Sequence, residues 1–277
     1  MKRLRVLLLH AVLALAAFGV LVPFLWLACA AFKQQKDMFT SAFLPWDNLG
    51  DLTLDNFRVL LTREPFAQWL LNSLFLSSLQ TALVVTLSSL GGFALAKYRF
   101  AGRRPLMLVM FVTLLLPAQV IYPSGGIDLV RAIGWVNSYA AIVVPGAVSV
   151  FGMFLFMQAM KAVPDELLHA GRVDGCSELR LWWEVALPIV RPMLGAYTLL
   201  SFLASWNSFL WPQIVLQDED KYTLPMGLTG MIGITEYETQ YGVLMAGTLL
   251  AVLPVMVLFF VLQKDFIAGL ASGAVKG

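Results

Sequence analysis

Six long stretches without a single Asp, Glu, Lys or Arg residue constrain the fold of this chain more than any other feature. A helix of roughly 20 apolar residues crosses the hydrocarbon core of a bilayer, which is about 30 Å thick, and each stretch is long enough. The chain is also 59% hydrophobic and 13% charged, with a mean hydropathy of +0.78, unlike an ordinary soluble domain. The sequence therefore predicts an all-α membrane protein with six transmembrane helices, over Val6–Phe32, Trp69–Ala96, Leu106–Ile127, Asn137–Met160, Pro192–Gln217 and Thr239–Gln263.

The first stretch follows Lys2, Arg3 and Arg5, as the apolar region of a signal peptide would. Such a region is typically 7–15 residues long, and this stretch is nearly twice that length. The segment Trp26–Cys29 has only a faint similarity to a lipoprotein cleavage site. We therefore expect a retained transmembrane helix.

The distribution of basic residues predicts the orientation of the helices. Thirteen of the 19 Lys and Arg residues fall in the N-terminus, in residues 97–105, in residues 161–191 and in the C-terminal tail, and six fall in the segments between. Because cytoplasmic loops carry the excess of Lys and Arg, we expect both termini to be cytoplasmic. The net charge of +2 then reflects orientation and not an affinity for nucleic acid.

The segments predicted to lie outside carry no clear active-site pattern. Residues 33–68 predict a small ordered element, and the acidic loop from Asp218 to Glu238 predicts either a solvated acidic rim or, less simply, a metal site. Cys29 and Cys176 are predicted on opposite sides of the membrane, so we expect no disulfide between them.

The predicted spans lack the ionisable groups that ion pumps and proton-coupled carriers usually need. His10 is the only ionisable exception. The sequence contains no H-E-x-x-H or G-x-S-x-G pattern, and no G-x-x-x-x-G-K-[ST] phosphate loop. A membrane enzyme and a proton-coupled secondary carrier are thus disfavoured, and any nucleotide must be bound by another chain.

The spans do contain neutral amides, hydroxyls and tryptophans. Such groups suit a pathway for a neutral polyhydroxylated solute, but they also hold helices together in membranes, and the sequence leaves both interpretations open. The candidates for pathway residues are Asn72, Gln119, Trp206, Asn207, Trp211 and Gln213; Gln80 and Ser208 lie in the same spans as some of these, and Gln158 lies in the fourth span.

The polar segment 161–191 predicts a helix–turn–helix between two spans. Pro164 followed by two acids is typical of a helix start, and the Asp174-Gly175 pair suits a helix end with a left-handed residue. Ser177 then suits the cap of a second helix. In that helix one apolar stripe is predicted, formed by Leu179, Trp182, Trp183, Ala186 and Leu187. The segment is either an interfacial anchor or a knob that docks into a cytoplasmic machine.

The same segment resembles the EAA loop of binding-protein-dependent ABC importer permeases. The similarity rests on the spacing of Pro164, Glu166, Asp174, Gly175, Pro188 and Pro192. The stretches "NSLFLSSLQTALVVTLSSLGGFALAKYRFAGRR", "SWNSFLWP" and "GLASGAVKG" resemble the carbohydrate, maltose-type branch, so the likeness covers nearly the whole chain.

The resemblance implies a type I ABC importer permease with a cytoplasmic coupling helix. It divides the chain into an N-terminal helix with an outer segment (1–68), a permease core (69–264) with the EAA loop at 161–191, and a short tail (265–277). It implies a plasma-membrane protein of a bacterium or archaeon that forms half of a pathway for a sugar or oligosaccharide by alternating access. The implied partners are a second related permease, two ATP-binding subunits that carry ATP and Mg, and an extracytoplasmic solute-binding protein. No cofactor and no catalytic residue are implied in this chain itself.

The residues that the resemblance assigns to the ATPase contact are Glu166, His169, Ala170, Gly171, Asp174 and Gly175. His169 stands where the family has a glutamate, and a protonated imidazole would repel a cation that a glutamate attracts. Ser208 stands where an acid is common in the family. A polyol phosphate such as glycerol 3-phosphate stays open as cargo, although an anion would favour a basic group in the pathway.

Overall fold

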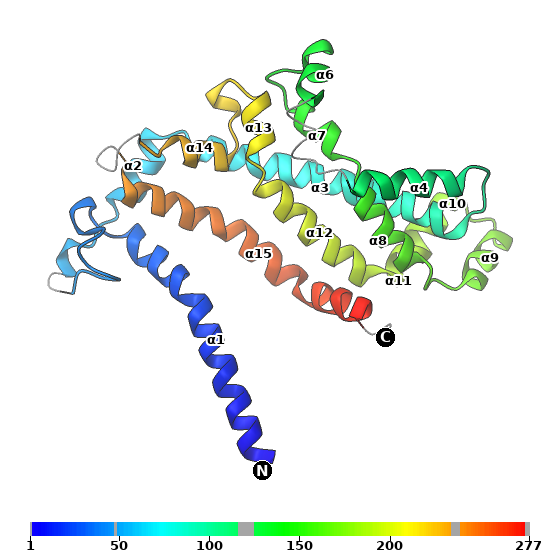
Figure 1. Cartoon of the computed structure of the whole chain (residues 1–277), viewed down its shortest axis with the longest axis horizontal. Coiled ribbons are helices and arrows are strands. Elements are labelled where there is room, and N and C mark those ends of the chain that lie inside the picture. Colours follow the sequence, from blue (N-terminus) through cyan, green and yellow to red (C-terminus); the bar gives the residue numbers. More distant parts are fainter. Residues whose placement is uncertain (1, 47–48, 116–124, 234–238, 275–277) are drawn as a thin grey trace. The chain divides into compact units, whose positions relative to one another are not determined.

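The computed structural model describes residues 2–46, 49–115, 125–233 and 239–274, and these form helices and loops without a β-strand (Figure 1). The four longest helices are α1 (Lys2–Ala31), α3 (Phe66–Lys97), α12 (Arg191–Trp206) and α15 (Tyr241–Ala274). The shorter helices are α2 (Asp55–Arg63), α4 (Arg103–Leu114), α6 (Ile127–Ala132), α7 (Ala140–Gly146), α8 (Val150–Met160), α9 (Asp165–Val173), α10 (Glu178–Arg180), α11 (Leu187–Ile189), α13 (Leu210–Val215) and α14 (Leu224–Gly230). Leu181–Ala186 forms a π-helical segment between α10 and α11, and short 3₁₀ turns lie at Gln35–Asp37, Leu49–Asp51 and Glu219–Lys221.

Within the described residues, four helical spans are long and apolar enough to cross a bilayer: Arg3–Ala31, Phe66–Lys97, Ala140–Met160 and Tyr241–Gly269. A fifth arises if Glu178–Ile189 and Arg191–Trp206 are one span, although these two helices meet at 89°. An all-helical, multi-pass membrane protein is therefore confirmed. The third predicted span is represented by the 12 residues of α4, because residues 116–124 lie outside the described part of the chain.

The chain divides into two compact units, one formed by residues 1–69 and 226–254 and the other by residues 70–225 and 255–277. In the first unit, the predicted ordered element after α1 is held by the buried Lys33 and the partly buried Asn56. The Lys33 ammonium donates to the Ser41 carbonyl oxygen at 2.6 Å, and the Asn56 amide donates to the carbonyl oxygens of Ala31 and Lys33 at 2.9 and 2.8 Å. These bonds tie the end of α1 to α2. Cys29 and Cys176 are both free thiols.

In the second unit, small residues allow α3, α8 and α12 to approach closely. A Cβ atom on Gly92 of α3 would lie 2.5 Å from the Cβ of Phe156 and 2.7 Å from the backbone nitrogen of Met157, both in α8. A Cβ on Gly152 of α8 would lie 2.2 Å from the hydroxyl of Tyr197 in α12. Glycine is therefore required at both contacts, as is common where helices pack in membranes. This packing supports the polar segment that follows α8.

Candidate functional site

The predicted helix–turn–helix is present, and we call α9 through α11 the loop hairpin (Figure 1). Pro164 precedes the first helix with an extended backbone, and the helix ends at Val173. Gly175 has a φ of +80°, the left-handed conformation that the Asp174-Gly175 pair predicts. The Ser177 hydroxyl accepts a bond from the backbone N–H of Arg180 at 3.4 Å and so caps the second helix.

Of the apolar stripe predicted for the second helix, Trp182, Ala186 and Leu187 are buried within the chain, and the other two residues lie at its surface. Leu179 is 66% exposed and Trp183 is 65% exposed, whereas Leu181 is fully buried. The cause is the π-helical segment Leu181–Ala186, whose turns hold more residues than an α-helix and so rotate the buried face. Leu181 and Trp182 then join Leu168 of α9 in a core that also includes residues of α3, α8 and α12.

The base of the loop hairpin is tied to the end of α3 by five polar residues, which we call the basal clamp: Lys97, Tyr98, Asp165, Arg172 and Glu178. The largely buried Lys97 ammonium contacts the Asp165 carboxylate at 2.7 Å and also donates to the Val163 carbonyl oxygen. Glu178 accepts two bonds from the Arg172 guanidinium, at 2.7 and 3.1 Å, and one from the Tyr98 hydroxyl. A carboxylate and a guanidinium that meet in this forked arrangement fix each other's orientation. The clamp therefore joins both helices of the hairpin to α3.

The charges of the basal clamp perturb one another's titration. The bonds from Arg172 and then Tyr98 hold the pKa of Glu178 below its ordinary value, and Glu178 raises the pKa of Arg172. The bond from Lys97 likewise lowers the pKa of Asp165. Both carboxyl groups are consequently ionised at neutral pH, so the clamp is fully formed there.

Most of the residues predicted to contact an ATPase lie on the outer face of the hairpin. Glu166, His169 and Ala170 are exposed on one face of α9, which Val173, 88% exposed, extends. Asp174 and Gly175 are exposed at the turn. Such a face, with a mixture of charged and apolar groups and no cover from its own chain, can dock a partner.

Gly171 has a different environment from the other predicted contact residues. It lies on the inner side of α9, where an added Cβ would be 2.4 Å from Cδ2 of the buried Leu181. Its small size therefore permits the two helices of the hairpin to close on each other.

Two of the predicted pathway residues hold elements of the chain together. The buried Asn72 amide of α3 donates to the carbonyl oxygens of Asp220 and Tyr222 at 2.8 and 2.9 Å. The buried Trp211 indole of α13 donates to the carbonyl oxygen of Ala141 in α7 at 2.8 Å. Both contacts favour the alternative that these polar groups stabilise helix packing.

The other pathway candidates among the described residues, Trp206, Asn207 and Gln213, have different environments. Trp206 is buried and stacks on Phe202, with ring centroids 5.6 Å apart. Asn207 is exposed at the end of α12, where its amide donates to the Leu203 carbonyl oxygen at 2.9 Å, and Gln213 is exposed on α13. Gln119 lies outside the described residues.

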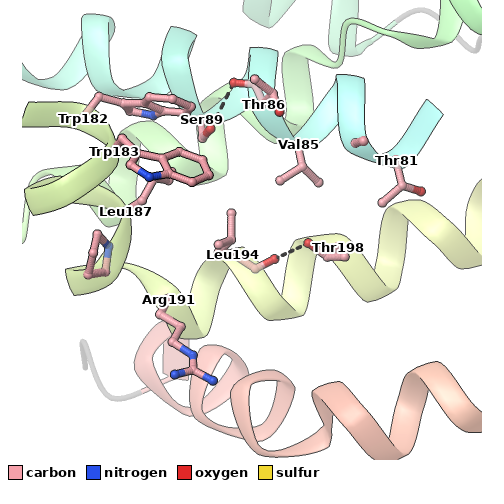
Figure 2. Close-up of a pocket in the computed structure, with 12 residues that line it drawn as sticks. Thr81, Val85, Thr86, Ser89, Trp182, Trp183, Leu187, Arg191, Leu194 and Thr198 are labelled. Atoms are coloured by element: carbon pink, nitrogen blue, oxygen red, sulfur yellow. Dashed lines mark hydrogen bonds between the residues drawn. The ribbon is translucent and has the colours of Figure 1, made fainter. Parts of the chain in front are cut away.

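The structure contains a pocket of about 560 Å³ that sequence reasoning missed. Figure 2 shows its walls, which come from α3, from the second half of the loop hairpin and from the start of α12. On α3, the lining residues Thr81, Val85, Thr86 and Ser89 follow helical spacing along one face. This hydroxyl-bearing face is the signal in the sequence, because Thr81, Thr86 and Ser89 recur along one face of the second span.

Comparison with known proteins places the chain in a family context. Residues 88–270 match the family described as "Binding-protein-dependent transport system inner membrane component". The chain is 35% identical over 265 residues to the arabinooligosaccharides transport system permease protein AraQ of Halalkalibacterium halodurans, covering 95% of this chain and 94% of the relative. It is 31% identical over 272 residues to the sn-glycerol-3-phosphate transport system permease protein UgpE of Salmonella typhi, covering 95% of each.

A solved structure shares the fold. A chain of a bacterial ABC transporter involved in the import of the acidic polysaccharide alginate superposes with a TM-score of 0.82 at 21% identity, covering 95% of this chain and 97% of the other.

Proposed function

We propose that the cargo of this chain is a neutral sugar or oligosaccharide. The chain belongs to the family of binding-protein-dependent transport system inner membrane components. The chain is a permease subunit of an ABC importer and not an enzyme. A neutral cargo is supported by the absence of Lys and Arg from the six apolar stretches, and by the similarity to a permease named for arabinooligosaccharides. The similarity to a glycerol-3-phosphate permease makes that anion the alternative to test.

We further propose that the chain crosses the plasma membrane six times, with both termini and the loop hairpin in the cytoplasm. The concentration of 13 of the 19 basic residues on one side supports this orientation.

The observation that carries the proposed mechanism is the attachment of the loop hairpin to the core of the second unit. We infer that the complex contains two ATP-binding subunits and that one of them binds this hairpin. Its contact would be the face formed by Glu166, His169, Ala170 and Val173. The ATP-binding subunits themselves would hold ATP and Mg. Because Leu168, Leu181 and Trp182 are buried together with residues of α3, α8 and α12, a displacement of the hairpin is transmitted directly to α3 and α12. The two outward- and inward-facing states of the pathway would alternate in this way.

The other proposed partners occupy surfaces that this chain leaves open. Of the 18-residue window that qualifies α1 as a membrane span, no residue is buried, so lipid and a second, related permease chain are its expected surroundings. The segment around residues 33–68 and the acidic loop that begins at Asp218 are the proposed contacts for an extracytoplasmic solute-binding protein.

The proposed function is tested by affinity purification of this chain from native membranes, followed by reconstitution of the co-purified complex into liposomes. We expect a second permease and an ATP-binding subunit in the complex, and ATP-dependent uptake of a neutral saccharide when the binding protein is added. Uptake of sn-glycerol 3-phosphate without any uptake of neutral saccharides would refute the proposed cargo. Transport by the isolated chain without ATP would refute the proposed coupling.

A further inference from the structure

The turn between α3 and α4 gathers three arginines around one open pocket of about 510 Å³, which we call the arginine pocket. Gly102 has a φ of +87°, a left-handed conformation, and the Arg103 N–H donates to the Phe100 carbonyl oxygen at 3.3 Å. The chain therefore reverses within this turn, and Arg99, before the reversal, lines the same pocket as Arg103 and Arg104, after it. The full lining consists of Arg99, Phe100, Gly102, Arg103, Arg104 and Pro105.

None of these three arginines forms an ion pair with a carboxylate of the described residues. No acid is near them in the sequence either, because residues 65–127 contain no Asp or Glu. The other basic residues of the segments 97–105 and 161–191 do have partners. Lys161 donates to the Gln158 amide oxygen at 3.0 Å, and a carboxylate lies within 3.5 Å of each of Lys97, Arg172, Arg180 and Arg191. Like charges that share a site repel one another, so three unneutralised guanidinium groups favour an anionic ligand.

The arginine pocket continues into an apolar face of α4. Arg104, Leu108 and Val112 recur every four residues, so they follow one another along the same side of the helix. Leu108 is 65% exposed and Val112 is 51% exposed. Another side of α4 packs on α8, where the ring centroids of Phe111 and Phe154 lie 5.4 Å apart. The cationic start of this predicted membrane span is thus followed by apolar surface that the described residues leave uncovered.

An anionic phospholipid matches both parts of this surface. Its phosphate can accept paired bonds from a guanidinium, the geometry for which arginine is favoured at phosphate sites. Its acyl chains can lie along Leu108 and Val112. Free inorganic phosphate would neutralise the arginines but leave the apolar face uncovered. An acidic surface of a soluble subunit would also pair with the arginines, but it could not enter the bilayer to cover Leu108 and Val112.

We propose that the arginine pocket binds the phosphate of an anionic phospholipid, such as phosphatidylglycerol, whose acyl chains lie along α4. This site goes beyond the proposed function and does not depend on which cargo the complex carries. Arg99 follows directly after Lys97 and Tyr98 of the basal clamp, so the bound headgroup lies where the loop hairpin is joined to α3.

The test measures which lipid lies next to this turn in the whole complex. A fluorophore is attached at Ala101→Cys, an exposed position in the turn, after Cys29, Cys176 and the reactive cysteines of the partner subunits are replaced by Ser. The complex is placed in phosphatidylcholine nanodiscs with a small fraction of nitroxide-labelled phosphatidylglycerol or, separately, nitroxide-labelled phosphatidylcholine. The ratio of quenching by the two labelled lipids gives the preference for the anionic headgroup. We expect a preference of at least about 10-fold, because each arginine near an anionic lipid contributes a factor of about 5.

Each of Arg99→Gln, Arg103→Gln and Arg104→Gln should lower this preference about 3- to 5-fold, and the triple variant should abolish it. The matched control is Arg131→Gln on α6, which removes an exposed arginine that lies 3.5 Å from Asp128 and is predicted on the opposite side of the membrane. The control should keep the preference of the parent complex. If the pocket variants also keep it, or if the control lowers it equally, the inference is wrong.

Two measurements on the parent complex keep the inference testable if a variant fails to assemble. Raising NaCl from about 0.05 M to about 0.5 M should lower the preference, because salt screens the attraction between the arginines and the phosphate. Millimolar inorganic phosphate should leave the preference as it is in NaCl of equal ionic strength; its loss would assign the pocket to free phosphate. Equal quenching by the two lipids, or none by either because a partner subunit covers the turn, would overturn the inference.

Discussion

Replacement of Gly175 tests whether the turn of the loop hairpin must hold its left-handed conformation for coupling. Its φ is +80°, and apart from its two chain neighbours no atom of the described residues lies within 4 Å of the position that a Cβ would take. The cost of a side chain at this position therefore comes from the backbone conformation alone. Its N–H donates to the Arg172 carbonyl oxygen at 3.1 Å, and the next residue's N–H donates to that of Gly171 at 2.9 Å. The series Gly175→Asn, Gly175→Ala and Gly175→Pro separates these contributions.

The expected costs follow from the geometry of each residue. A left-handed conformation costs an L-residue about 1–2 kcal/mol, and Asn tolerates it better than Ala. Proline fixes φ near −65° and has no N–H, so Gly175→Pro should cost about 3 kcal/mol or more. Because 1.4 kcal/mol is a factor of ten, local opening of the turn should increase about 5- to 30-fold with Ala and more than about 100-fold with Pro.

The assay is hydrogen exchange of residues 168–178 in the reconstituted complex, measured together with the ratio of saccharide imported to ATP hydrolysed. We expect hydrogen exchange to become faster, and the ratio of saccharide imported to ATP hydrolysed to fall, in the order Gly, Asn, Ala, Pro. Assembly of the complex should be unchanged. Gly230→Ala is the control, because its Cβ also meets nothing within 4 Å but its φ is not positive. The reasoning is refuted if Gly175→Pro exchanges and couples like the parent, or if Asn and Ala are as damaging as Pro.

Three further predictions concern the clamp and the predicted pathway residues. Glu178→Gln should lower the ratio of saccharide imported to ATP hydrolysed about 2- to 5-fold, because a neutral amide cannot accept both Arg172 bonds. The control Glu184→Gln breaks a pair with Arg180 inside one helix and should leave the ratio unchanged. Equal effects of the two variants would argue against a role of the basal clamp in coupling. Trp211→Phe should lower the free energy of unfolding of the complex by about 1 kcal/mol, because the indole loses its bond to the Ala141 carbonyl oxygen. Asn207→Leu should reduce uptake and leave assembly intact. The opposite pattern would assign packing to Asn207 and the pathway to Trp211. The hydrogen-exchange protection of the hairpin should be retained on acidification from pH 7 to the ordinary glutamate pKa of 4.5 and lost below it. The pKa of Glu178 is lowered in the folded hairpin, so its contribution to stability disappears only as the pH falls through that lowered pKa. Loss of protection well above pH 5 would contradict this expectation.

Local patterns in the sequence were sufficient for the spans and for the turn. The lengths of the charge-free stretches predicted helices that cross a membrane, because backbone groups in lipid must be satisfied within the helix itself. Pro164, Gly175 and Ser177 predicted the ends of the hairpin helices for a similar reason, since each acts on the backbone of its own turn. These predictions required no knowledge of what lies across the fold.

The apolar stripe and the pathway residues depended on contacts between distant segments. The buried face of the second helix differs from the predicted stripe because the π-helical segment places Leu181 inside and Trp183 at the surface, which a 3.6-residue periodicity cannot anticipate. For Asn72 and Trp211, the sequence left the choice between pathway and packing open. The structure favours packing, because carbonyl oxygens more than 60 residues away accept their bonds.

The sequence by itself determined that this chain is an all-helical membrane protein with a stiff polar hairpin between two spans. Only the tertiary structure decided which polar groups are already paired and which are not. The buried hydroxyl of Thr81 and the buried indole N–H of Trp182 have no hydrogen-bond partner among the described residues, whereas the buried Asn72 amide donates to two carbonyl oxygens. A hydrogen bond depends on where its acceptor lies, and in this chain the acceptors are brought near by folding and not by sequence distance.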